Sequence, residues 1–193
     1  FWGAADGSTG ITNACKTVAA AGTATCNGDG NGQLQALSYT VEPFRFWHHL
    51  ANAGLIEGTY SGITDGTNDA SATANNSPRG KIATSLWYAG YMAPVTGGTS
   101  FFDGTYDSYF QFGLPATSGN GLPWSGFATP EEAWNIDTKM DDGKPGQGKL
   151  FARDPAGMTG TNCTTATGGA QTSADYYLVS KVKNCSFMFR QAF

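Results

Sequence analysis

The sequence has few charged residues. Only 13% of its 193 residues are charged, against about 25% in typical soluble domains. The 11 lysines and arginines form no cluster, and the net charge at neutral pH is -4. Binding to a phosphate backbone requires a basic surface. Nucleic acid is therefore excluded as an expected partner.

Histidine is also scarce, with only His48 and His49, which are adjacent. Neighbouring side chains on a helix point about 100° apart, so these two cannot readily act as a pair or hold one metal ion. The sequence contains no G-x-S-x-G motif, and a serine hydrolase would have to use one of these histidines as its base. We expect no enzymatic activity, and a secreted hydrolase built on His48 or His49 is an alternative.

Long hydrophobic runs are lacking as well. No segment approaches the roughly 20 apolar residues that span a bilayer, and Phe1 is not followed by the features of a signal peptide. The 27 glycines predict long turns. Aromatic residues, at 13%, supply large anchors for a packed core. We expect one globular domain over residues 1–193, with long Gly- and Thr-rich loops.

Four cysteines are present, and none forms a C-x-x-C motif. An even number without thiolate-ligand spacing predicts two disulfides formed in an oxidising compartment, which is extracellular or periplasmic. Three connectivities are possible, and closeness in sequence favours Cys15 with Cys26 and Cys163 with Cys185. Four buried free thiols are the alternative.

Periodicity and capping signals predict two helices and three strands. They are helices over residues 40–54 and 129–143, strands over 81–92 and 101–114, and a closing strand or hairpin arm over 176–189. The second helix has a clear start, because Thr129 and Glu132 form a capping box and Pro130 takes the first helical position. Residues 58–80 read as a surface loop.

Two pairs of neighbouring carboxylates lie on the second helix. Glu131 and Glu132 could be the acid and base of a glycosidase, but capping and the helix dipole explain both without catalysis. Asp141 and Asp142 lie at the C-terminal end, where the helix dipole disfavours negative charge. That mismatch indicates a binding or bonding role for the second pair.

Half of an EF-hand calcium loop follows Cys26. Its oxygen ligands at the first, third, fifth and seventh positions would come from Asn27, Asp29, Asn31 and the carbonyl of Gln33. Gly32 takes the glycine position. Ser38 stands where the bidentate acid belongs, and Glu42 could complete the shell instead. The sequence predicts a weak Ca²⁺ site of extracellular type, with a plain Asn/Gly turn anchored by Cys26 as the alternative.

Two segments resemble proteins with the prepilin-type cleavage/methylation signature, the type IV pilin and pseudopilin-like family of Gram-negative bacteria. Residues 42–58 are similar to a helix-and-turn segment that these proteins carry after an Asn/Gly/Asp-rich loop. Residues 133–149 look like their ID-x-K-x-DDG-x-P-x-x-G stretch. Cys163 and Cys185 are similar to the disulfide-bounded C-terminal region of many pilins.

This resemblance implies an α+β head in which an antiparallel sheet packs against helices. It also implies a structural subunit of a type IV pilus-like or pseudopilus filament at the bacterial surface, with other subunits as its partners. The family's cleavage glycine and apolar helix are not in this sequence. We expect them upstream of Phe1, where that helix would be the chain's only membrane contact. A Ca²⁺ ion in such a head would stabilise a loop.

A secreted carbohydrate-binding or adhesive module is the alternative from another class. Trp87, Tyr88, Tyr91 and Trp124 are candidates for aromatic platforms in exposed loops. Flat aromatic rings stack on sugar rings. The other interpretation is that these aromatic residues anchor the core and the loops.

Overall fold

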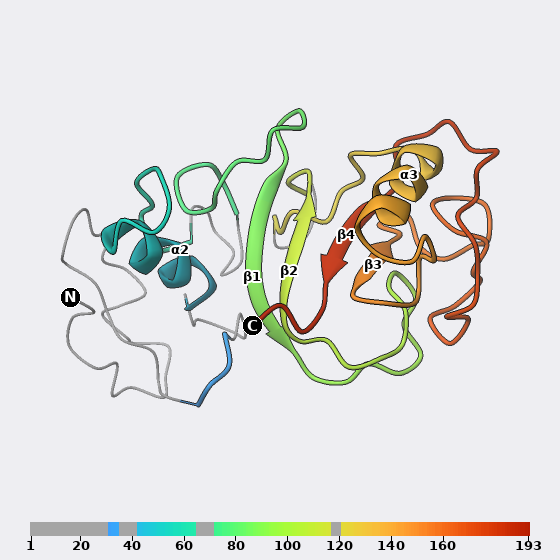
Figure 1. The fold of residues 1–193 in the computed structure, drawn as a ribbon, viewed down its shortest axis with the longest axis horizontal. Helices are drawn as coiled ribbons and strands as arrows, with labels where there is room; N and C mark the ends of the chain where they lie inside the picture. The colour runs from blue at the N-terminus through green and yellow to red at the C-terminus, as the bar shows by residue number, and fades with distance from the viewer. Residues whose placement is uncertain (1–30, 35–41, 65–71, 117–120) are drawn as a thin grey trace.

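The structure, a computed structural model, describes residues 31–34, 42–64, 72–116 and 121–193 (Figure 1). Predicted features at Cys15, Cys26, Asn27 and Asp29 lie outside these residues. The described elements are α2 (Glu42–Asn52), β1 (Leu86–Met92), β2 (Asp107–Gly113), α3 (Pro130–Met140), β3 (Leu150–Arg153) and β4 (Ser186–Phe189). This mixture of helices with one antiparallel sheet confirms the predicted α+β class.

The four strands form one antiparallel sheet in the order β1-β2-β4-β3. β1 and β2 pair along their full length, from Leu86 opposite Gly113 to Met92 opposite Asp107. β4 lies between β2 and β3, so that Phe187 faces residues of both neighbours. The C-terminal strand thus joins two parts of the chain that are distant in sequence.

Each face of the sheet carries its own cluster of apolar side chains. Because side chains alternate along a strand, Leu86, Tyr88 and Met188 lie in one cluster, whereas Phe112 and Phe187 belong to another. Both clusters are rich in buried aromatic rings, and Tyr88 is completely buried. The core is therefore a pair of aromatic layers with the sheet between them.

The two helices lie near opposite edges of the sheet (Figure 1). α2 runs beside β1, where Phe44 packs edge-on against Tyr88 with ring centroids 6.0 Å apart. Trp47 stacks on Phe110 at 5.7 Å. α3 contacts β3, and its Ala133 is fully buried. No helix among the described residues has both the length and the apolar character needed to cross a bilayer.

The elements are shorter than the sequence predicted. The strand predicted over 81–92 begins only at Leu86, after a turn in which Ala83 has φ of 48°. The strand predicted over 101–114 begins at Asp107, whose φ is 50°. Such left-handed conformations interrupt a strand, and sequence does not signal them at Ala. The closing strand is limited to β4, and β3 was not predicted.

The segment predicted as a surface loop over residues 58–80 is in part a core segment. Of its described residues, Tyr60, Asn76 and Ser77 are buried. Asn76 holds this segment together, because its side-chain oxygen accepts from the amide of Thr73 and its Nδ2 donates to the carbonyl of Ile63. The segment thus packs against the sheet and lines one side of a hollow beside β1.

Candidate functional site

The ID-x-K-x-DDG stretch fastens the end of α3 to the chain around it. Asp137 is fully buried. Its Oδ2 accepts a hydrogen bond of 2.7 Å from the hydroxyl of Tyr176. Its Oδ1 accepts from the amide of Gly143 at 3.2 Å. The buried carboxylate therefore joins α3, the turn after it and the C-terminal part of the chain.

Asp141, one turn later, fixes the beginning of β3. Its Oδ2 accepts hydrogen bonds from the amides of Lys149 and Leu150, the latter at 2.8 Å. Gly148 approaches so closely that an added Cβ would lie 2.0 Å from the same oxygen. This confirms a bonding role for Asp141 at the helix end where its charge is unfavourable.

The electrostatics of this cluster are set by burial. Burial raises the pKa of Asp137 to about 6, and the hydrogen bonds from Tyr176 and Gly143 oppose that shift. The charges of Asp142 and Asp141 raise it further. Burial also raises the pKa of the Tyr176 hydroxyl, and Asp137 adds to the effect. The pair is a structural hydrogen bond, with Tyr176 as the donor.

The carboxylates of Asp137, Asp141 and Asp142 could together hold a metal ion, since one oxygen of each lies within 4.8 Å of the others. All three carboxylates already accept hydrogen bonds, and Asp142 Oδ1 accepts from the amide of Lys144 at 2.8 Å. Lys144 in turn pairs with Asp175 at 2.6 Å. These hydrogen bonds give the three aspartates a structural role, because they join the end of α3 to neighbouring segments.

The predicted calcium loop is only partly within the described residues. The side-chain oxygen of Asn31 accepts from the backbone amide of Gln33 at 2.7 Å. Gly32 has φ of 75°, which suits a glycine position. Glu42 begins α2. Since Asn27 and Asp29 lie outside the described residues, the Ca²⁺ site stays a prediction.

The two histidines occupy different environments. His48 is buried, and its Nδ1 lies 3.2 Å from a guanidinium nitrogen of Arg45, which can only donate. His49 is partly exposed, and the two rings are 6.1 Å apart. The ring of His48 thus contributes to the packing of α2, whereas His49 lies closer to solvent.

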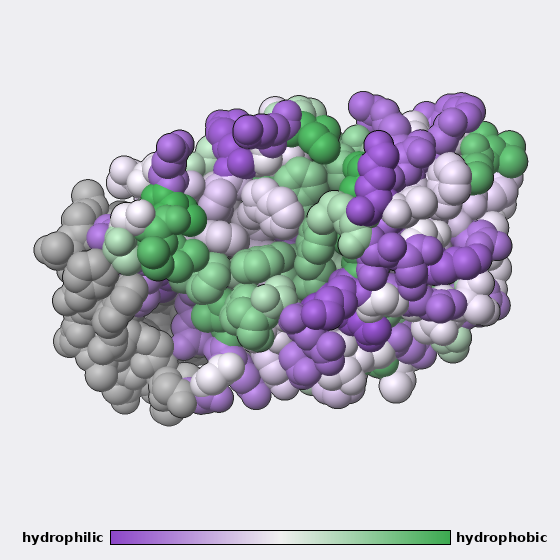
Figure 2. All heavy atoms as spheres, in the orientation of Figure 1, coloured by the Kyte–Doolittle hydropathy of each residue, from purple (hydrophilic) through white to green (hydrophobic). Residues whose placement is uncertain are grey.

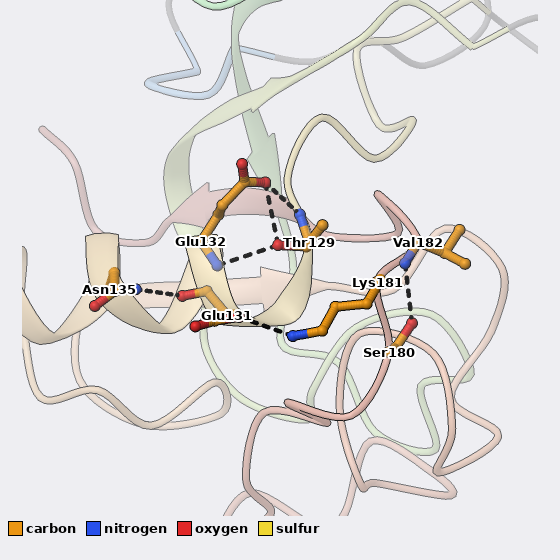
Figure 3. A network of polar contacts seen from close by, with 7 residues as sticks. All are labelled: Thr129, Glu131, Glu132, Asn135, Ser180, Lys181 and Val182. Carbon is orange, nitrogen blue, oxygen red and sulfur yellow. Dashed lines mark hydrogen bonds and ion pairs between the residues drawn. The ribbon is translucent and has the colours of Figure 1, made fainter.

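In the first carboxylate pair on α3, Glu132 has the capping role that the sequence indicated (Figure 3). Thr129 Oγ1 accepts from the amide of Glu132, and Glu132 Oε2 accepts from the amide of Thr129 at 2.8 Å. The latter bond is the main cause of the lowered pKa of Glu132. Glu131 forms an exposed ion pair with Lys181 at 2.9 Å. Both side chains are explained without catalysis.

The disulfide between Cys163 and Cys185 is present, which confirms one of the two predicted pairs. It closes a loop with a sequence separation of 22, and such a loop contributes about 3 kcal/mol by chain entropy. Asp154 braces the same loop, because its buried carboxylate accepts from the amide of Cys163 at 3.0 Å. The segment between Cys163 and Cys185 is thus joined at its two ends, and its first residue is also bonded to Asp154.

Three of the four aromatic residues proposed as exposed-loop platforms lie in a strand, so the prediction was wrong for these three, whereas Trp124 does lie in a loop. Trp87, Tyr88 and Tyr91 belong to β1, and Tyr88 is completely buried. Trp124 is partly buried and carries the guanidinium of Arg153 4.4 Å above its ring. Alternation along β1 places the ring of Tyr88 on one face of the sheet and the rings of Trp87 and Tyr91 on the other.

A hollow of about 780 Å³ lies between α2, residues 56–60 and the sheet. Its aromatic lining includes Trp47, Tyr60, Trp87 and Phe110. In Figure 2 pale and green side chains gather on this part of the surface. The sequence did not reveal this site, because its rings come from segments that only the fold brings together.

Comparison with protein families, characterised proteins and solved structures finds no match for this chain.

Proposed function

We propose that this chain is the globular head of a structural subunit in a type IV pilus-like or pseudopilus filament. The observation that carries the proposal is a braced apolar loop, residues 176–185, at the end of the molecule opposite α2 (Figure 1). A filament subunit needs a rigid surface that neighbouring subunits can cover. This loop is held rigidly, and it exposes apolar side chains.

The loop is rigid because four contacts hold it. Cys185 at its end is bonded to Cys163. Tyr176 at its start bonds to Asp137 and lies in a β-bridge with Thr164. The pairing of Lys181 with Glu131 ties its tip to the first turn of α3 (Figure 3).

Between these anchors the loop presents apolar side chains to solvent. Leu178 is 43% exposed, Val179 76% and Val182 60%. Figure 2 shows a green area at this end of the molecule. Clustered exposed apolar residues mark contact surfaces more often than isolated ones do. Three such residues on a braced loop therefore favour contact with another protein surface.

Two further observations support a structural role. In the stretch that resembles the pilin-like family, Asp137 and Asp141 fasten α3 by bonding to the chain around α3 and β3. The disulfide favours an oxidising compartment, as a surface filament requires.

The test is to shear filaments from cells that make the full-length protein and to label them with gold-conjugated antibody against this domain. We expect label along the filaments. Val179→Asp should reduce the assembled fraction about tenfold, because it places a charge in the contact. The matched control is Leu55→Asp, at a residue 69% exposed near the end of α2. Wild-type protein recovered only as free monomer would overturn the proposal.

A further inference from the structure

The hollow beside β1 has two aromatic surfaces at a right angle. Trp47 and Phe110 stack nearly parallel, with ring centroids 5.7 Å apart and planes 26° apart. Trp87 stands against Phe110 at 6.4 Å with an interplanar angle of 85°. Trp87 is partly exposed, whereas Trp47 is buried. The hollow thus presents the accessible indole of Trp87 beside the stacked rings of Trp47 and Phe110.

Polar groups stand at the rim of this hollow. Glu57 and Arg79 line it and are exposed. Within the described part of the chain, neither side chain forms a hydrogen bond or an ion pair. The Nε1–H of Trp47 also has no acceptor among these residues. An acceptor and a donor of opposite charge are therefore available to a ligand above an aromatic floor.

The turn that places Glu57 is rigid. The hydroxyl of Tyr60 donates to the carbonyl of Glu57 at 3.0 Å. Gly58 between them has φ of 105°, and an added Cβ there would lie 2.9 Å from that hydroxyl. The rim is therefore formed in advance, which lowers the entropic cost of binding.

The chemistry of the lining selects among classes of ligand. A purely apolar chain would form no hydrogen bonds with the two charged rim groups and would make no use of them. The opposite charges of Glu57 and Arg79 give the rim no net preference for an anion or for a cation. A neutral sugar ring has an apolar face of C–H groups for the indole and hydroxyls that both donate and accept. The volume of about 780 Å³ lies in the range of small-ligand sites.

From this combination we propose that the hollow between α2 and β1 binds a neutral hexopyranose unit of a glycan, with Trp87 as the stacking platform. Glu57 accepts from ring hydroxyls and Arg79 donates to them. This site is separate from the apolar loop at residues 176–185. A subunit that carries it would attach its filament to a glycan surface, and failure of the sugar site would leave the filament proposal intact.

The experiment records ¹H–¹⁵N spectra of the whole chain, in which the tryptophan indoles report separately. The probes are the methyl pyranosides of glucose, galactose, mannose and N-acetylglucosamine, with glucuronate as a charged comparison. We expect one or more neutral probes to shift the indole signal of Trp87, with a dissociation constant near 1 mM. The signal of Trp134, 40% exposed on α3, should not move.

Variants make the assignment specific. Trp87→Ala should weaken binding at least about tenfold, and Trp134→Ala should not change it. Because Trp87→Ala removes a ring from the sheet, the surface variant Glu57→Gln with Arg79→Gln provides a second test, with an expected loss of about threefold to tenfold. Thermal unfolding confirms that each variant is folded.

Three results would overturn the assignment. One is that no neutral pyranoside shifts Trp87 at about 50 mM, a concentration far above the expected dissociation constant. Another is that Trp134 and Trp87 shift equally, which would show non-specific contact. The third is that the Trp87 signal changes on dilution of the protein alone or only with an apolar peptide, which would show that a second copy or a peptide occupies the hollow.

Discussion

The hydroxyl of Tyr176 donates to the buried carboxylate of Asp137 across 39 residues of sequence. This bond joins the loop that the Cys163–Cys185 disulfide closes to the C-terminal half of α3. Because Asp137 also accepts from the amide of Gly143, one carboxylate organises three separate segments. The stability of the C-terminal half should therefore depend on it.

Tyr176→Phe should lower the free energy of unfolding by about 1–3 kcal/mol, because a buried carboxylate loses its hydroxyl donor. Urea unfolding followed by tryptophan fluorescence measures the change. Tyr177→Phe is the control, since Tyr177 is adjacent but partly exposed. Equal and small losses in the two variants would show that the bond contributes nothing to stability.

The buried carboxyls should also make stability depend on pH. Burial is the main cause that raises the pKa of Asp137 and of Asp154 from 3.8 to about 6. The folded state therefore binds more protons than the unfolded chain between these values. The stability that protonation contributes is complete below the unfolded pKa and is lost as pH rises through about 6.

Asp137→Asn isolates this effect because asparagine does not titrate. The stability advantage of the wild type over this variant should shrink by about 1–3 kcal/mol between about pH 4 and pH 7.5. Urea unfolding of both proteins across that range measures it. An advantage that grows with pH would mean that the hydrogen bonds from Tyr176 and Gly143 outweigh burial.

Gly148→Ala should destabilise the protein by more than about 2 kcal/mol, because the residue has a left-handed conformation and lies against Asp141. Its φ is 66°, and the new Cβ would be 2.0 Å from the Asp141 carboxylate. Gly168→Ala is the matched control, with open space around the added Cβ. Thermal unfolding should show a large loss for the first variant and a change within about 0.5 kcal/mol for the second.

Thr129→Ala should cost about 1 kcal/mol, the usual value of an N-cap. The substitution removes the bond that Thr129 Oγ1 accepts from the amide of Glu132, whereas the bond from the backbone amide of residue 129 to Glu132 Oε2 can still form (Figure 3). Lys181→Ala removes only the exposed pair with Glu131 and should change stability by less than about 0.5 kcal/mol. Denaturant unfolding that ranks these two variants in the opposite order would contradict the capping role.

The features that the sequence predicted well are local ones. The start of α3 follows from residues within one turn, as does the unfavourable position of Asp141 at its end. The partner of Asp141 could not be predicted, because the amides of Lys149 and Leu150 reach it only when β3 is in place. β3 itself has four residues, too short for a clear periodicity.

The aromatic hollow shows the opposite case. Trp47 and Trp87 are far apart in sequence, and each fits the pattern of an ordinary core residue in its own element. Their meeting depends on α2 lying beside the edge strand β1. Sugar-stacking rings were expected in loops, whereas the accessible ring belongs to a strand. Periodicity gives the face of an element and leaves open which other element covers it.

The predicted calcium loop and the aspartates of α3 are two possible positions for Ca²⁺, and one measurement separates them. With chelator-treated protein and about 5 mM Ca²⁺, a site with a dissociation constant of 10⁻⁴–10⁻³ M should stabilise the fold by about 1–2 kcal/mol. Asp29→Asn should abolish the rise in melting temperature, and Asp142→Asn, at an exposed residue, should preserve it. The reverse pattern would place the ion at the end of α3, and no rise in the wild type would leave residues 27–33 as a plain Asn/Gly turn.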